Sequence, residues 1–206
     1  MSPKIINLCR VLTAVTIVCA WFTSPSANAG EHRLPEMPVR ELPMLFGGAF
    51  TLVDKDGNTR TDQDFRGTYM LINFGYSNCP NICPTDLTTI STAVDMLGHQ
   101  GERVQPIFIT VDPERDTPER LKEYLFNFHP RLIGMGGSEA QIRAVAKVYR
   151  VHRGKIILDD TSAENYLATH SSLTYLMGPD GAFLTLFPHD TAPQLMADAL
   201  RRHFGG

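Results

Sequence analysis

The sequence has 206 residues, with 19 basic and 22 acidic side chains and a formal net charge of −3. Because it has no excess of positive charge, nucleic-acid binding and attachment to an anionic membrane surface are excluded. Its length suits one domain with a single hydrophobic core. Of the four cysteines, Cys9 and Cys19 lie in the first 29 residues, and the two that follow are too few for a small scaffold held together by disulfides.

The first 29 residues have the organisation of an export signal. Two basic residues, Lys4 and Arg10, precede an uncharged and mostly apolar run at 11–22, and Ala29 ends an A-x-A cleavage pattern. About 12 apolar residues are fewer than the roughly 20 that a membrane-spanning helix needs. We therefore expect a signal peptide cleaved after Ala29, and an uncleaved N-terminal anchor is the alternative.

Cleavage would leave one pair of thiols, Cys79 and Cys83. The chain from residue 30 onward has 17 basic and 22 acidic residues, a formal charge of −5. In an exported protein, a single cysteine pair is a disulfide staple, a redox couple or part of a metal site.

The chain after the signal begins without regular structure. Residues 30–45 contain three prolines and no sustained hydrophobic period, so we expect an extended lead-in to a domain at 46–206. The domain opens with a hairpin at 49–61, which turns at Asp56-Gly57. The apolar run YMLINF at 69–74 predicts a strand buried on both faces of a sheet.

Helices and strands alternate through the rest of the chain. Thr117 before Pro118, and Ser138 with Gln141, are helix-capping signals. The expected elements are a helix at 84–97, a strand at 104–111, a helix opening at 118, a short strand at 132–134, a helix across 142–148, a polar loop at 159–169, a hairpin at 173–187 and a last helix at 193–203. This order predicts an α/β fold with a mixed central sheet flanked by helices, and it is similar to the thioredoxin fold.

The cysteine pair stands at the start of the helix expected at 84–97. Pro84 disfavours helical dihedral angles at Cys83 but suits the first helical position, so we expect Cys83 near the N-cap and Cys79 in the loop before it. Unpaired N–H groups and the positive end of the helix dipole lower the pKa of a thiol there, and the charge of Asp86 opposes that shift in part.

Three roles are open for this pair. A disulfide closing so short a loop would constrain the unfolded chain little, so stability alone is a poor reason for it. A redox bridge is compatible with the spacing, since Cα atoms four residues apart in a turn lie about 6 Å from each other. The three-residue spacer departs from the CxxC of thioredoxin-like oxidoreductases. Two thiolates also suit Cu(I), which needs fewer further ligands than a structural zinc site.

Three segments together resemble one known family. GYSNCPNICP at 75–84, FITVDPERDTPERL at 108–121 and THSSLTYLMGPDGAFL at 169–184 are similar to motifs of the Sco (SenC) family of copper-binding cytochrome c oxidase assembly proteins. The likeness covers most of the chain after the lead-in. It implies a thioredoxin-like fold, with copper bound through Cys79, Cys83 and His170.

His170 is the histidine that this resemblance selects. It leads into the strand expected at 173–177, which a thioredoxin-like sheet would place next to the strand that precedes Cys79. Many family members carry an aspartate directly before this histidine, whereas Thr169 stands here. The substitution removes a carboxylate that could orient the imidazole.

Other candidate ligands have simpler explanations. His129, His152 and His189 remain as alternative sources of an imidazole. Asp112 and Asp116 in VDPERDT are explained by turn formation and by capping of the next helix, so they are left out of the ligand set.

The resemblance implies a periplasmic metallochaperone, which we expect to be a monomer. It would deliver copper to the dinuclear copper site in subunit II of cytochrome c oxidase, or to another membrane oxidase, or reduce the cysteines of that site. Another copper carrier is a further candidate partner. The alternative is a thiol–disulfide oxidoreductase without a copper-delivery role, with Cys79 and Cys83 as its catalytic redox pair. The sequence thus leaves open whether the protein is an enzyme.

Overall fold

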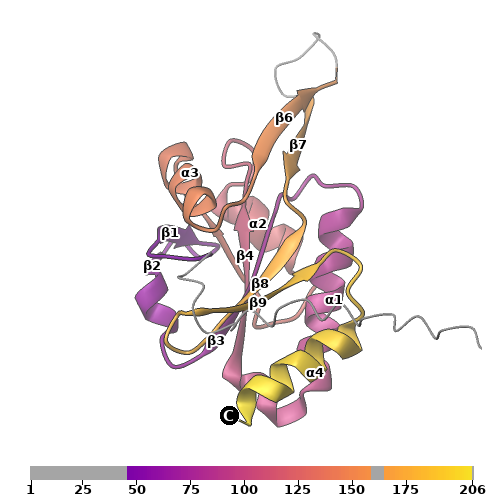
Figure 1. Ribbon diagram of the computed structural model, residues 1–206. Coiled ribbons are helices and arrows are strands. Elements are labelled where there is room, and N and C mark those ends of the chain that lie inside the picture. The colour runs from indigo at the N-terminus through magenta and orange to yellow at the C-terminus, as the bar shows by residue number, and fades with distance from the viewer. Residues whose placement is uncertain (1–45, 159–164, 206) are drawn as a thin grey trace, which may run out of the picture. The chain divides into compact units, whose positions relative to one another are not determined.

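The computed structural model describes residues 46–158 and 165–205. The signal peptide expected at 1–29 and the lead-in expected at 30–45 lie outside the described residues. The strands, labelled in Figure 1, are β1 Thr51–Asp54, β2 Thr59–Thr61, β3 Tyr69–Gly75, β4 Val104–Thr110, β5 Ile133–Gly136, β6 Arg153–Ile157, β7 Tyr166–His170, β8 Leu173–Met177 and β9 Phe183–Pro188. The helices are α1 Ile82–Met96, α2 Pro118–Leu125, α3 Glu139–Val148 and α4 Pro193–Phe204, with 3₁₀ helices η2 Asp62–Phe65 and η3 Gly98–Arg103.

Seven of the strands form one mixed sheet in the order β2-β1-β5-β4-β3-β8-β9. β3, β4 and β5 run parallel to one another, and the other neighbours are antiparallel. Every residue of β3 is buried, as the uninterrupted apolar run predicts for a strand covered on both faces. The α/β class, the hairpins β1–β2 and β8–β9, and the pairing of β8 with β3 are confirmed.

The sheet separates two hydrophobic cores. Side chains alternate along β3, so Ile72 and Phe74 pack into the core that contains Ile142 of α3. Leu71 packs into the opposite core, which contains Leu87 of α1 together with buried residues of α2 and α4. Figure 1 shows α3 on one side of the sheet and α1 and α4 on the other. None of the described helices has the length and apolar character that crossing a bilayer requires.

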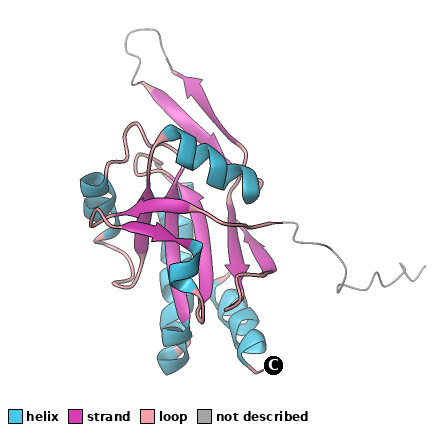
Figure 2. Cartoon of the chain, turned by 90° about the vertical axis from the view of Figure 1, so that its left-hand side faces the viewer, coloured by secondary structure: helices cyan, strands magenta, loops and turns pink. Residues whose placement is uncertain are grey.

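The sequence does not predict a second sheet, which consists of β6 and β7 alone (Figure 2). The prediction of a loop at 159–169 is wrong from residue 166 onward, because Tyr166–His170 pairs with β6 along its whole length. Tyr166 and Ala168 are buried while Leu167 and Thr169 are half-exposed, which is the alternation of a strand with one covered face. The hairpin carries His170 at its C-terminal end.

Candidate metal centre

The two cysteines lie in the segment that joins β3 to α1. The N–H of Cys79 donates to the carbonyl of Tyr76 at 3.2 Å, which closes a turn directly after β3. Helix α1 begins at Ile82 with Asn81 at its N-cap, so the expected start at residue 84 is wrong by two residues. Pro84 falls within the first turn, where the backbone N–H that proline lacks would have no helical partner.

The earlier helix start places Cys83 inside the first turn, fully buried, while Cys79 is half-buried. The backbone N–H of Cys83 donates to Cys79 Sγ at 3.4 Å. A hydrogen bond from the Cys83 side chain, supported by His170 and by the N–H groups of Cys83 and Asn81, lowers the pKa of Cys79 to about 3. That hydrogen bond and burial raise the pKa of the Cys83 thiol.

At neutral pH the pair therefore holds a thiolate on Cys79 and a proton on Cys83. The helix terminus was expected to lower the pKa of Cys83, and this prediction is wrong for that residue. Burial, the negative charge on Cys79 and the carboxylate of Asp86 all favour the protonated thiol.

Gly75, the last residue of β3, leaves room for the Cys83 sulfur. A Cβ atom at this position would lie 2.8 Å from Cys83 Sγ and 2.6 Å from Cε2 of Phe108. Both groups are fully buried and have little space to retreat. The glycine in the segment NFGYSNC therefore has a packing reason, which is the close approach of the sulfur to the strand.

His170 comes to the thiols from the end of β7. Its Nε2 lies 3.5 Å from Cys83 Sγ, and its Nδ1 lies 3.1 Å from the carbonyl oxygen of Ser171. A carbonyl only accepts, so Nδ1 carries a proton in this hydrogen bond, and Nε2 is the ring nitrogen that faces the sulfur. The Tyr76 ring meets the imidazole edge-on, with 6.0 Å between centroids. The Ser171 carbonyl thus orients the ring where Thr169 supplies no carboxylate.

The separation of sulfur and imidazole fits a shared metal ion. With the bond lengths of zinc sites, about 2.3 Å to sulfur and about 2.0 Å to nitrogen, a metal between them sets the two atoms about 3.5–3.7 Å apart. Cys83 Sγ and His170 Nε2 stand at 3.5 Å. Across 46–158 and 165–205, no three His, Cys, Asp or Glu side chains stand ready-made as a complete metal site. Closure around an ion therefore needs a further adjustment, and the half-buried Cys79 is the freer of the two sulfurs to make it.

A mostly apolar groove of about 370 Å³ gives access to this group. The groove runs between the cysteine segment and the β6–β7 hairpin. Ile82, at the start of α1, and Ile156, in β6, are 37% and 54% exposed along it. Its lining residues are Tyr76, Cys79, Pro80, Asn81, Ile82, Ile156, Leu167, Ala168, Thr169, His170 and Ser172. Cys79 and His170 are therefore open to a molecule that enters the groove, whereas Cys83 lies behind them.

Two aspartates that the sequence assigns to turns and capping also support the site. Asp116 is 3% exposed and accepts hydrogen bonds from the backbone N–H and the hydroxyl of Ser77 at 3.0 and 2.5 Å, and from the Thr110 hydroxyl at 2.5 Å. Asp112 accepts from the Tyr166 hydroxyl of β7 at 2.6 Å. The segment after β4 thus holds the cysteine loop on one side and β7 on the other.

The alternative histidines have other contacts. His189 Nδ1 lies 2.7 Å from a carboxylate oxygen of Asp86, and His129 Nε2 lies 3.5 Å from one of Asp95. The backbone N–H of His152 donates to the Ser171 hydroxyl at 3.0 Å. Among the histidines of 46–158 and 165–205, His170 is the one that the structure places against a thiol.

Known proteins resemble this chain in sequence and in fold. The SCO1/SenC family model matches residues 40–205. The protein sco1 of Schizosaccharomyces pombe is 40% identical over 159 residues, and the match covers 77% of this chain but only 60% of that protein. A SCO2-like protein of Rickettsia conorii is 39% identical over 98% of both chains.

A solved structure of Bradyrhizobium japonicum ScoI with copper bound is 41% identical, with a TM-score of 0.70, and the match covers 76% of this chain and 98% of that one. Yeast Sco1 with copper bound gives a TM-score of 0.72 at 36% identity, over 78% and 89% of the two chains. These structures confirm the fold that the motifs predict.

Proposed function

Because the chain belongs to the SCO1/SenC family, we propose that it binds copper through Cys79, Cys83 and His170 and delivers it to the dinuclear copper site of cytochrome c oxidase. The observation that carries this proposal is the imidazole Nε2 at 3.5 Å from the Cys83 sulfur, beside the Cys79 thiolate. Relatives solved with copper bound support it.

The donor set selects the metal. Two thiolates and an imidazole are soft and intermediate donors, which favour copper over magnesium or calcium. A structural zinc site would take a fourth protein ligand, and His170 is the one imidazole that the described structure places at this pair. Three donors at the end of an open groove leave a position where an incoming ligand can bind, which suits a carrier that must release its metal.

Copper uptake has a defined proton balance at this site. Cys79 is already a thiolate at neutral pH, whereas Cys83 keeps its proton. A metal ion that binds both sulfurs displaces the Cys83 proton, so uptake releases one proton from the pair. The contact of His170 Nδ1 with the Ser171 carbonyl keeps Nε2 directed at the sulfur.

The order in which the ligands release copper follows from how exposed each one is. An acceptor that enters the groove meets Cys79 and His170 first, because both line it, and reaches the buried Cys83 last. Incoming thiolates or imidazoles would displace the donors one at a time in that order. The acceptor that the family resemblance implies is subunit II of the oxidase. A second copper carrier is the candidate donor.

Reduction of a disulfide in the target is a second candidate function, favoured by the unequal pKa values of the two thiols. The Cys79 thiolate would attack one sulfur of the target disulfide, form a mixed disulfide and release the other target sulfur, which takes up a proton. Cys83, after losing its proton, would attack Cys79 Sγ and release the second target sulfur. Two electrons pass to the target, and Cys79–Cys83 ends as a disulfide.

Substitution of His170 separates the two activities. His170→Ala should lower the copper affinity of the reduced protein by at least about tenfold while leaving disulfide reduction intact, because thiol exchange does not use the imidazole. His99→Ala, an exposed histidine in η3, is the matched control. Titration with copper, followed by thiolate-to-copper charge-transfer absorbance, measures the first activity, and reduction of a model disulfide peptide measures the second. A reduced wild-type protein that takes up no copper would reject copper delivery.

We further propose a periplasmic location, supported by the signal pattern at residues 1–29. Fractionation of cells that express the full chain tests this directly. A mature protein cut after Ala29 in the periplasmic fraction is the expected result, and an uncut chain in the membrane fraction would reverse it in favour of an anchor.

A further inference from the structure

The position of His170 depends on how the base of the β6–β7 hairpin is held. Within the described residues, β6 and β7 pair only with each other, so the larger sheet does not hold them through backbone hydrogen bonds. In the hairpin register, Arg153 stands directly opposite His170. Opposed residues of an antiparallel pair have Cβ atoms about 4.5–5.5 Å apart, so contacts that fix Arg153 also fix the end of β7.

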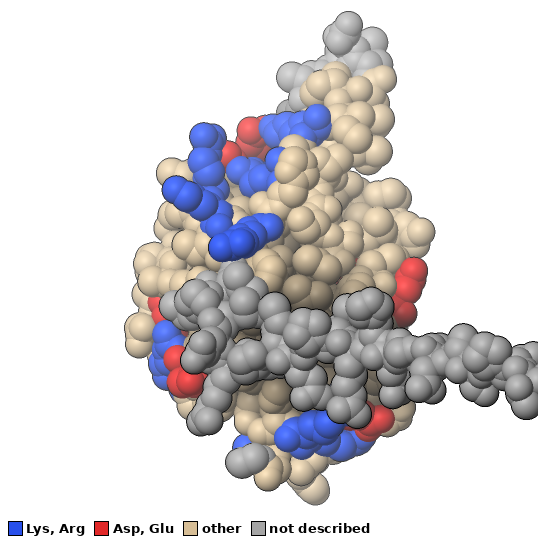
Figure 3. Space-filling model, in the orientation of Figure 1, with Lys and Arg blue, Asp and Glu red and all other residues tan. Residues whose placement is uncertain are grey.

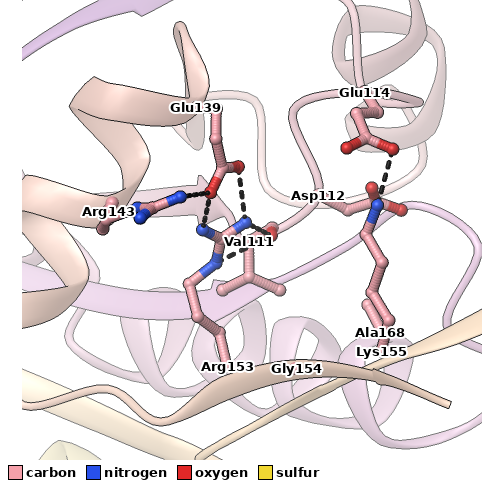
Figure 4. Close-up of a pocket in the computed structure, with 9 residues that line it drawn as sticks. All are labelled: Val111, Asp112, Glu114, Glu139, Arg143, Arg153, Gly154, Lys155 and Ala168. Atoms are coloured by element: carbon pink, nitrogen blue, oxygen red, sulfur yellow. Dashed lines mark hydrogen bonds and ion pairs between the residues drawn. The ribbon is translucent and has the colours of Figure 1, made fainter.

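Arg153 makes contacts on both sides of its guanidinium group. Figure 4 shows the group between Glu139 and the backbone of Val111. Nη1 and Nη2 lie 2.6 and 2.9 Å from the two carboxylate oxygens of Glu139, and Nη2 donates to the Val111 carbonyl at 2.8 Å. The Arg153 side chain is only 20% exposed. A paired carboxylate and a carbonyl in this geometry hold an arginine more firmly than a single surface ion pair does.

Both partners of Arg153 belong to well-fixed parts of the fold. The N–H of Val111 donates at 2.7 Å to the carbonyl of Gly75, the residue of β3 that packs against the Cys83 sulfur. Glu139 is the first residue of α3, whose N-terminus is closed by a reciprocal capping box. Arg153 therefore connects the strand pair that carries the imidazole to the end of the sheet that carries the thiols.

We propose that Arg153 is a positioning residue for the copper site: by bonding Val111 and Glu139, it holds His170 within reach of the two sulfurs and so sets how tightly the third donor binds. This inference rests on the proposed ligand set. It adds a residue outside the three motifs that carry the family resemblance.

The specific contacts of Arg153, and not its charge, carry this role. Basic side chains gather over α3 and the start of β6 in Figure 3, so one charge more or less changes little in that region. Arg143 also bonds Glu139, at 3.2 Å, but it does so from within α3 and is 75% exposed. Lys155 pairs with Glu114 at 2.6 Å, with both side chains substantially exposed. Exposed pairs of this kind contribute little.

Loss of Arg153 should weaken copper binding through the imidazole alone. Arg153→Leu removes the donor to Val111 and Glu139, so the end of β7 should move more freely and His170 should occupy its bonding position for a smaller fraction of time. The apparent affinity falls in proportion to that fraction. Removing a residue that orients a metal ligand typically costs about 10–100-fold in affinity, and we expect a loss at the lower end of that range.

A double-mutant comparison tests the inference. The reduced full-length protein is titrated with copper against a competing chelator as wild type, Arg153→Leu, His170→Ala and the combined variant. Arg143→Leu is the matched control, since it removes a charge and a Glu139 partner but no contact with the hairpin. If Arg153 acts through His170, Arg153→Leu should cost about tenfold in the wild-type background and nothing further in the His170→Ala background. Arg143→Leu should match wild type.

Two further measurements separate positioning from general damage. Hydrogen exchange of the metal-free protein should be faster in Arg153→Leu at the amides of β6 and β7 but unchanged in β3 and β4. Arg153→Lys, which keeps the charge and loses the paired geometry, should fall between wild type and Arg153→Leu in copper affinity.

Each contrary result has a clear consequence. Wild-type affinity in Arg153→Leu would overturn the inference, and so would an equal loss with and without His170. An unchanged affinity in His170→Ala alone would instead reject the ligand set proposed above.

Discussion

Replacement of Gly75 by alanine should lower both the stability of the protein and its copper affinity, because the new methyl group would crowd the buried Cys83 sulfur. The new Cβ would lie 2.8 Å from Cys83 Sγ, 2.6 Å from Cε2 of Phe108 and 3.0 Å from its Cζ. Gly75 has no left-handed backbone angle, so the substitution causes crowding without backbone strain. The sulfur would have to retreat by about 0.6 Å to reach ordinary van der Waals contact.

The size of the effect follows from this crowding. Excess volume in a packed core costs about 1–3 kcal/mol, which for a chain of this size lowers the melting temperature by roughly 2–12 °C. Retreat of the sulfur also changes its 3.5 Å separation from His170 Nε2. We therefore expect Gly75→Ala to lose about tenfold in copper affinity in addition to its loss of stability.

Urea unfolding of the reduced, metal-free protein measures the stability, and chelator competition measures the affinity. Gly136→Ala in β5 is the matched control, because its added Cβ would meet Thr110 Cγ2 at 3.4 Å and nothing closer. Because its added methyl group makes only ordinary van der Waals contacts, that variant should be at least as stable as wild type. If Gly75→Ala proves as stable as the control and binds copper equally well, the close packing of sulfur against β3 does not matter for the site.

Two further predictions concern the surroundings of the site. Ile156 lines the groove, so Ile156→Asp should slow copper transfer to a copper-free oxidase domain by about tenfold without changing copper affinity. Ile157 is equally exposed but does not line the groove, so Ile157→Asp should transfer copper at the wild-type rate. Equal slowing by both substitutions would contradict a role for the groove. The hydrogen bond to Asp86 raises the pKa of His189 above the ordinary 6.5, so the stability from this pair is fully present below about pH 6.5 and is lost as pH rises through the raised value. Urea unfolding from about pH 6 to about pH 8 should therefore show less pH dependence in His189→Gln than in wild type, and an identical profile would exclude the pair as a source of stability.

Much of the fold could be predicted because its signals are local. The continuous apolar run of β3 indicates a strand buried on both faces, and Ser138 with Gln141 indicates the start of α3. The sequence signals of the β6–β7 hairpin are weaker. Ile156, Ile157 and Leu158 are three apolar residues in a row, so they do not alternate with polar ones, and all three are more than half exposed in the structure. Its strands depend on pairing with each other and on contacts such as Tyr166 with Asp112, which join residues 54 positions apart.

The candidate site shows the same division. The motifs point to Cys79, Cys83 and His170, which the fold brings together across 87 residues of chain. The distribution of protons between the two sulfurs could not be predicted from the sequence, because it depends on how deeply Cys83 is buried. The contacts of Asp116 with Ser77, and of Arg153 with Val111, could not be predicted from the sequence either. Each joins segments that only the folded sheet places side by side.

X-ray absorption spectroscopy of the reduced protein, loaded with one copper per chain, tests the ligand set most directly. We expect two sulfur neighbours and one imidazole around the metal in wild type, and loss of the imidazole scattering in His170→Ala with both sulfurs retained. A wild-type spectrum without an imidazole, or a His170→Ala spectrum that still contains one, would contradict the assignment of His170 as the third donor.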